Sequence, residues 1–264
     1  MDEKQSGGGR YIYCIAAEPF REKYGNSSIQ GFESEVSTVR FRDICAVVGS
    51  LPPDLCKVNA TRKNVLTHQR VMEDVMKDTT VLPVKFGTVA ESSGNDDPEE
   101  RIKNRVLKER HQELAELLAE MEGKVELGLK ALWADMKMIY SEIVAENPRI
   151  AALRSKVDRL PENKSYQSKI TLGRLVKDAL DEKRAWESMA MIKTLKEACV
   201  DSKETNTFGD QMIVNGAFLV KSELEDEFDK RVEELMSSND GRVIFRCLGP
   251  VPPCNFVELV ITWG

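Results

Sequence analysis

The sequence predicts an α+β protein built from two small domains, and three observations predict it. A chain of 264 residues, 41% of them hydrophobic, exceeds the roughly 100–200 residues of one domain and can bury a core. Short runs rich in β-branched and aromatic residues alternate with longer segments of helical period. Each half of the chain combines a few strands with helices between them, which is typical of α+β sandwiches.

The first predicted domain covers residues 1–122. Its apolar runs predict strands, its three- and four-residue periodicity predicts helices, and Arg42-Asp43 predicts a tight hairpin turn. Residues 25–28 are expected to form a loop. The expected strands span residues 11–16, 36–41, 44–48 and 81–86, and the expected helices span residues 61–77 and 99–121.

The second predicted domain covers residues 123–264 and contains a long helical insertion at about 135–202. Pro148 and Pro161 break this insertion, because proline cannot continue a helix. Further strands are expected at residues 125–133, 212–220, 243–247 and 256–261, and a helix is expected at 223–236. This pattern predicts a ferredoxin-like C-terminal domain, and the same topology is expected for the N-terminal domain.

Charge and hydropathy narrow the classes of function. The formal net charge of −6 gives the chain little of the phosphate neutralisation that drives non-specific nucleic-acid binding. No apolar stretch approaches the ~20 residues of a membrane-spanning helix. The polar start of the chain, residues 1–10, lacks the apolar region of a signal peptide. We therefore expect a cytoplasmic protein with no membrane span and no nucleic-acid partner.

The sequence offers no recognisable catalytic constellation. Its two histidines are His68 and His111; His68 is either a metal ligand or general base, or a buried helical histidine, and the second interpretation is favoured. No cluster of histidine, cysteine and carboxylate side chains has metal-ligand spacing. No glycine-rich phosphate loop or nucleophile elbow is present. We expect no enzyme, no catalytic residue, no metal and no cofactor.

Two features of the first domain suggest a surface for a protein partner. Tyr11 and Tyr13 lie on one face of the first strand, and Pro83 removes a ladder donor, so the strand 81–86 is expected either to lie at a sheet edge or to be bulged there. The partner-binding residues expected from this are Tyr11, Tyr13, Leu82, Pro83, Lys85 and Phe86. Strand aromatics also stack bases in RNA-binding sheets, so a small-molecule or nucleic-acid-binding ferredoxin-like module is the alternative.

The segment 249–256 contains three prolines and is stiff and extended. A stiff segment loses little entropy when it docks, so we expect it to pack against residues 10–122 and to fix the angle between the domains. The expected interdomain residues are Gly249, Pro250, Pro252, Pro253 and Phe256. An ordinary proline-rich loop is the other interpretation.

Four segments together resemble the gas vesicle F/L family. They are the RYIYCI opening with the following ICAVVGS, the LPVKFGT run at 82–88, the strand at 212–220, and the GPVPPCNFVEL tail. LPVKFGT is similar to the family's L-P-V-R-F-G-T, and the tail is similar to its G-P-W-P-P-Y-S-F-V. Val251, Cys254 and Lys85 depart from the family's usual Trp, Tyr and Arg.

This resemblance implies a two-domain protein that takes part in gas vesicle formation. Members of the family are held to bind the small hydrophobic shell protein, and no catalytic activity is attributed to them. The expected partners are therefore the major shell protein and other gas vesicle proteins. The expected role is that of a non-enzymatic assembly factor or minor structural protein associated with the vesicle.

Overall fold

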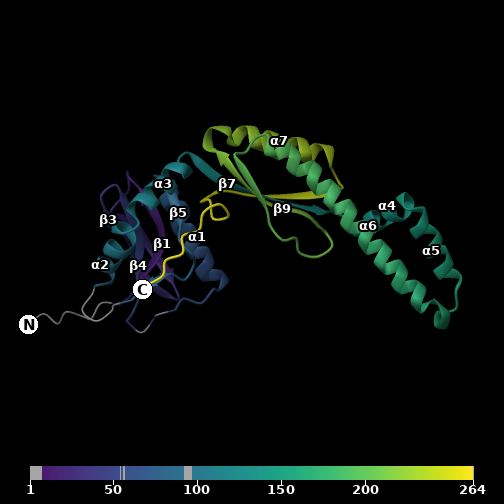
Figure 1. The fold of residues 1–264 in the computed structure, drawn as a ribbon, viewed down its shortest axis with the longest axis horizontal. Coiled ribbons are helices and arrows are strands. Elements are labelled where there is room, and N and C mark those ends of the chain that lie inside the picture. The colour runs from purple at the N-terminus through teal and green to yellow at the C-terminus, as the bar shows by residue number, and fades with distance from the viewer. Residues whose placement is uncertain (1–7, 54, 56, 92–96, 264) are drawn as a thin grey trace, which may run out of the picture. The chain divides into compact units, whose positions relative to one another are not determined.

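The computed structural model describes residues 8–53, 55, 57–91 and 97–263, and Figure 1 shows the order of its elements. The strands are β1 (Arg10–Ala17), β2 (Lys23–Ile29), β3 (Phe32–Phe41), β4 (Ile44–Ser50), β5 (Val81–Pro83), β6 (Val89–Ala90), β7 (Lys124–Trp133), β8 (Asp201–Glu204), β9 (Met212–Lys221) and β10 (Val243–Val251). The helices are α1 (Arg62–Met76), α2 (Pro98–Arg101), α3 (His111–Met121), α4 (Met136–Glu146), α5 (Pro148–Arg159), α6 (Glu162–Lys196) and α7 (Glu225–Ser238). A π-helical segment, η1 (Ile102–Lys108), and a 3₁₀ turn, η2 (Ser222–Leu224), complete the described elements.

The α+β class is confirmed, because helices accompany two separate antiparallel sheets. The chain forms two compact units: residues up to Glu126 together with residues from Pro250 onward, and residues Leu127–Gly249. Residues 250–264, expected in the second domain, therefore belong to the first unit. The predicted boundary between two folding domains, after residue 122, stays a prediction.

The sheet of the first unit has the strand order β2-β3-β4-β1-β5, and β6 also pairs with β1. β1 and β4 are central and buried, as their uninterrupted apolar runs predict. A register shift between Ile12 and Cys14 inserts one extra residue into β1. Because of this bulge, Tyr11, Tyr13 and Cys14 all pack in one core cluster with apolar side chains of α1.

Three expectations for the first unit are wrong. Residues 25–28 lie inside β2, because they find backbone partners on β3, with Gly25 at a positive φ of 75°. The predicted continuous helix at 99–121 changes to π-helical hydrogen bonding at 102–108 before α3 begins. The first four strands follow one another with no helix between them, so this unit does not have the β-α-β-β-α-β order of a ferredoxin-like fold.

The ends of the predicted strands near Pro83 and Phe256 also differ. β5 stops at Pro83, and Val84 forms a single parallel bridge with Leu259. The segment 256–261, expected to be the last strand, makes this bridge at Leu259 in place of a ladder. The backbone turns at Asn255 and Phe256, at the start of this segment, because the Phe256 N–H donates to the Pro253 carbonyl.

The sheet of the second unit has the strand order β10-β7-β9-β8. The alternate residues of β7 from Val125 to Trp133 are buried, as predicted. From Leu127 onward they share one core cluster with apolar residues of α6 and α7, so both helices cover the same face of the sheet. Figure 1 shows α7 running along the sheet and α4 and α5 beside the far part of the long α6. Pro148 and Pro161 separate the three helices as expected, whereas β8 was missed because residues to 202 were predicted helical.

Candidate functional site

The aromatic residues expected to bind a partner are inside the first unit. Tyr11 and Tyr13 are 0% and 1% exposed, so the expectation of an exposed tyrosine face is wrong. Leu82 and Pro83 are also buried, whereas Lys85 is exposed and Phe86 is half-buried. Helix α1 explains this placement, because its apolar side chains pack on the face of β1 that carries both tyrosines.

His68 of α1 completes a buried aromatic cluster with Tyr11, Tyr13 and Phe86. The Tyr11 hydroxyl lies 2.9 Å from His68 Nδ1 and accepts a hydrogen bond from the Gly87 amide at 3.3 Å. The Tyr13 ring stacks on the imidazole, with 5.8 Å between their centres. The Tyr13 hydroxyl lies 2.5 Å from Ser27 Oγ. The polar ends of these rings therefore have partners without reaching solvent.

The cluster is electrically neutral near neutral pH. Burial lowers the pKa of His68 from 6.5 to about 4, against the opposing effect of a hydrogen bond to the Val84 backbone. Burial also raises the pKa of Tyr13 to about 12, and it raises that of Tyr11 well above its ordinary value. A ring that is neutral, buried and hydrogen-bonded serves packing, which is the interpretation of His68 favoured from the sequence.

The predicted sheet edge at β5 is occupied by the C-terminal segment of the same unit. The Leu259 amide donates to the Pro83 carbonyl at 2.9 Å, and the Lys85 amide donates to the Leu259 carbonyl at 3.0 Å. Leu259 is 4% exposed. The missing donor at Pro83 did mark the last strand of the sheet order, but the backbone groups beside it already have partners.

The proline-rich segment is divided between two environments. Gly249 and Pro250 lie in β10 and are exposed, whereas Pro252 and Pro253 are buried. Phe256 is half-buried, and the neighbouring Asn255 amide donates to a Glu126 carboxylate oxygen at 2.7 Å. The role of this segment in fixing the angle between the units stays a prediction.

The second unit contains a charged network that was not predicted from the sequence. Arg242, just before β10, contacts Glu187 of α6 at 2.7 Å and Glu142 of α4 at 2.9 Å. The Trp133 indole N–H donates to Glu187 at 2.8 Å. Lys183 lies 3.1 Å from Glu142. These residues are far apart in the chain and share no motif spacing, so only the fold brings them together.

The electrostatics of this network are those of a structural cluster. Hydrogen bonds to Glu187 and Glu142 raise the pKa of Arg242, and the hydrogen bond from Arg242 lowers the pKa of Glu142. The network lines a hollow of about 360 Å³ together with Trp186 and Met191. Each carboxylate at its wall is directed at a cation of the same cluster, which stabilises their charged forms.

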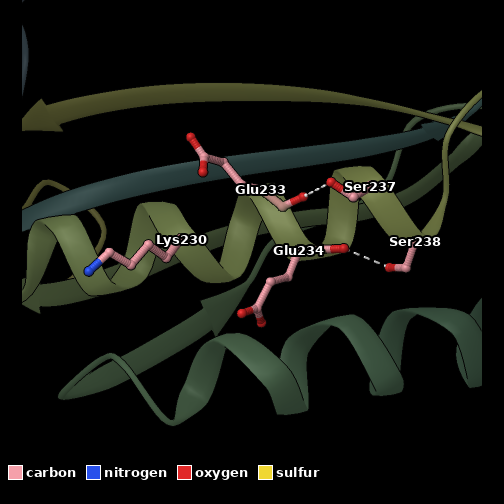
Figure 2. A pocket seen from close by; sticks show the side chains of 5 residues that line it. All are labelled: Lys230, Glu233, Glu234, Ser237 and Ser238. Atoms are coloured by element: carbon pink, nitrogen blue, oxygen red, sulfur yellow. Dashed lines mark hydrogen bonds between the residues drawn. The ribbon is translucent and has the colours of Figure 1, made fainter.

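A second hollow, of about 640 Å³, lies over α7 and is lined by Lys230, Glu233, Glu234, Ser237 and Ser238. Figure 2 shows that one helix supplies all five side chains and that both serine hydroxyls turn back onto it. Ser237 Oγ donates to the Glu233 carbonyl and Ser238 Oγ to the Glu234 carbonyl, each at 2.8 Å. Both hydroxyls therefore bond to the backbone of their own helix, four residues back along the chain.

The described part of the chain, residues 8–53, 55, 57–91 and 97–263, lacks two kinds of functional feature. Within it, no group of three or more histidine, cysteine and carboxylate side chains is placed to hold a metal ion. None of its helices combines the length and the apolar character needed to cross a membrane.

The fold and these sites together define a two-unit α+β protein whose buried polar groups are paired in structural networks. The family model for "Gas vesicle synthesis protein GvpL/GvpF" matches residues 9–258, and the chain belongs to this family. Gas vesicle protein F of Streptomyces sp. (strain CB03234) is 27% identical over 215 residues, which cover 81% of this chain and 84% of that protein. Gas vesicle protein F of Nostoc sp. is 26% identical over 255 residues, which cover 95% and 98%.

Two crystal structures share the fold. The gas vesicle protein GvpF from Anabaena sp. PCC7120 superposes with a TM-score of 0.80 at 22% identity, covering 96% of this chain and all of that one. The GvpF structure from Microcystis aeruginosa gives a TM-score of 0.74 at 23% identity. The resemblance to the F/L family stated from the sequence is thus confirmed.

Proposed function

We propose that this protein takes part in gas vesicle formation as a non-enzymatic assembly factor or minor structural protein. In this proposal it binds the small hydrophobic shell protein, and further gas vesicle proteins, in the cytoplasm and at the vesicle. The observation that carries the proposal is the family match over residues 9–258, which spans nearly all of both units.

The chemistry of shell assembly supports this role. A protein that packs into a gas-impermeable wall exposes large apolar surfaces before it assembles, and such surfaces aggregate unless a partner covers them. A chain with a net charge of −6 stays dispersed and can hold such subunits apart. No reacting group is required for this task, in keeping with a family named for gas vesicle synthesis.

We also propose that the second unit is ferredoxin-like. Its strand order, β10-β7-β9-β8, is the fourth, first, third and second strand of that unit. Helices connect the first strand to the second and the third to the fourth. This is the connectivity of a β-α-β-β-α-β unit, with α4, α5 and α6 in place of the first helix.

The role is tested by deleting the gene in a vesicle-forming host and restoring it on a plasmid. We expect the deletion to abolish or deform the vesicles seen by electron microscopy and the restored gene to recover them. Co-purification of the protein with washed vesicles then separates a wall component from an assembly factor. Normal vesicles in the deletion strain, or robust turnover of a metabolite by the pure protein, contradicts the proposal.

A further inference from the structure

The edges of the two sheets differ in how they are protected. β2 exposes Lys23, Gly25 and Asn26, and β8 is four residues long and exposes Asp201, Lys203 and Glu204. β5 is covered by the backbone of Leu259. Short length, charge and a covering segment are the usual protections against unwanted strand pairing.

β10 differs from these edges because it exposes large apolar side chains, although it also carries the exposed Arg246 and, near its end, Pro250. It is nine residues long and ends the sheet order of the second unit. Ile244 is 44% exposed and Leu248 is 60% exposed, although both are apolar. Such an edge presents unpaired backbone groups beside apolar side chains, which favours the addition of a further strand.

The register of β10 on β7 identifies the outward backbone groups. The Ala134 amide donates to the Arg242 carbonyl at 2.9 Å, and Leu248 lies against Gly128. Both contacts fit one antiparallel register, in which alternate residues of β10 pair with β7. The amides of Phe245, Cys247 and Gly249 then point away from the sheet, toward a further strand.

The same register places two like charges side by side on the face opposite the helices. Lys130 of β7 lies across from Arg246 of β10, between Ile244 and Leu248, and both basic side chains are exposed. Among the ion pairs of the described residues, neither Lys130 nor Arg246 takes part. Like charges directly opposite each other are destabilising, and a carboxylate placed over them relieves the repulsion.

A hollow lined by both apolar and polar side chains continues the edge on its other side. It has a volume of about 580 Å³ and is lined by Met236, Ser237, Asp240, Val243, Ile244 and Phe245. Met236 is 47% exposed within it. A strand added to β10 would thus meet backbone donors, a hollow of mixed polarity on one side and a basic pair on the other.

We propose that the outer edge of β10 binds an extended apolar segment that carries a carboxylate, by adding it to the sheet as a further strand. This inference rests on the proposed function, in which the segment belongs to the small hydrophobic shell protein. The carboxylate faces Lys130 and Arg246, and apolar side chains two positions on either side of it meet Ile244 and Leu248.

Charge argues against a second copy of this chain, and the aliphatic flanks argue against RNA. A second copy of this chain, paired antiparallel about Arg246, would set Arg246 opposite its own counterpart. RNA binding by sheets depends on aromatic stacking platforms, whereas Ile244 and Leu248 on this face are aliphatic. A heterologous strand with an acidic side chain satisfies both the basic pair and the apolar flanks.

The test captures the tagged full-length protein from cells that co-express the shell protein and measures the retained shell protein by mass spectrometry. Cys247→Pro removes one outward amide without breaking the ladder to β7, and Cys247→Ala is its matched control. Arg246→Glu reverses the charge, and Arg246→Lys is its matched control. We expect Cys247→Pro and Arg246→Glu each to lower retention about tenfold, and both controls to keep it.

The outcomes separate the two proposals. If the unaltered protein retains no shell protein, the partner assigned under the proposed function is wrong. If it retains the shell protein and both Cys247→Pro and Arg246→Glu do so equally, with unchanged melting temperatures, strand addition at β10 is wrong. Retention that disappears on nuclease treatment overturns the inference in favour of a nucleic acid, and dimers lost in Cys247→Pro overturn it in favour of self-pairing.

Discussion

Each unit of the protein contains a network of polar side chains, buried in the first unit and partly buried in the second, and the two networks differ in charge. In the first unit, Tyr11, Tyr13 and His68 are joined by neutral hydrogen bonds. In the second, Arg242 holds Glu187 and Glu142 by ionic contacts. Both networks connect a helix to a sheet. The first unit makes this connection with neutral groups, and the second makes it with charged groups.

This difference in charge predicts which change destabilises each unit. A neutral network weakens when a proton is forced onto it, because its imidazole is desolvated. An ionic network weakens when one member is removed, because the remaining charge is left buried without its partner. The two networks can therefore be broken separately, one by acid and the other by substitution.

The largest effect is expected for Arg242→Met. This change leaves Glu187, which is 7% exposed, without its cation, and should lower the stability of the second unit by about 3 kcal/mol. Hydrogen exchange measured by mass spectrometry checks it, since amides of residues 127–249 should exchange faster while those of β1 and β4 change less.

The matched control is Lys177→Met, which removes an exposed cation from an i, i+4 pair with Asp181 on α6. Exposed pairs of this kind contribute little, so its exchange rates should stay near those of the unaltered protein. Equal effects of the two substitutions would show that the Arg242 network is no more important than a surface pair.

Acid should destabilise the first unit through His68. Its pKa is about 4 when folded and 6.5 as a free side chain, so between these values the unfolded chain binds more protons. The stability that neutral His68 contributes is complete above pH 6.5 and is lost as the pH falls toward 4, by a total of about 3 kcal/mol. Urea unfolding at several pH values measures this loss.

His68→Gln, which cannot titrate, should flatten that part of the pH profile even if it lowers stability at neutral pH. His111→Gln is the control, because His111 lies toward the surface beside Asp43 and should leave the His68 contribution in place. A profile that is equally steep in the His68→Gln protein would remove His68 as the source of the pH dependence.

The smallest of these effects is expected for Tyr11→Phe. It removes the hydroxyl that faces His68 Nδ1 and the Gly87 amide, and leaves their buried polar atoms without that partner. We expect a loss of about 1–2 kcal/mol in urea unfolding. Tyr166→Phe is the control, because Tyr166 is 67% exposed and should change stability little. If Tyr11→Phe leaves the free energy of unfolding unchanged, the hydroxyl of Tyr11 adds nothing to the packing of the rings.

The sequence predicted the elements whose signals are local. Alternation along residues 125–133 indicated β7, and Pro148 and Pro161 marked helix boundaries. Each of these depends on side chains and backbone only a few residues apart. The resemblance to the gas vesicle F/L family likewise came from short segments that follow one another in the same order along the chain.

Tertiary structure alone decided what covers each face and edge. Periodicity shows that Tyr11 and Tyr13 share a side of a strand, but the packing of α1 against that side decides that it is buried. Pro83 marks a strand at the end of a sheet, but only the return of the chain at Leu259 closes it. The pairing of Arg242 with Glu187 and Glu142 left no trace in local spacing, because such contacts join segments far apart in the chain and local residue patterns do not encode them.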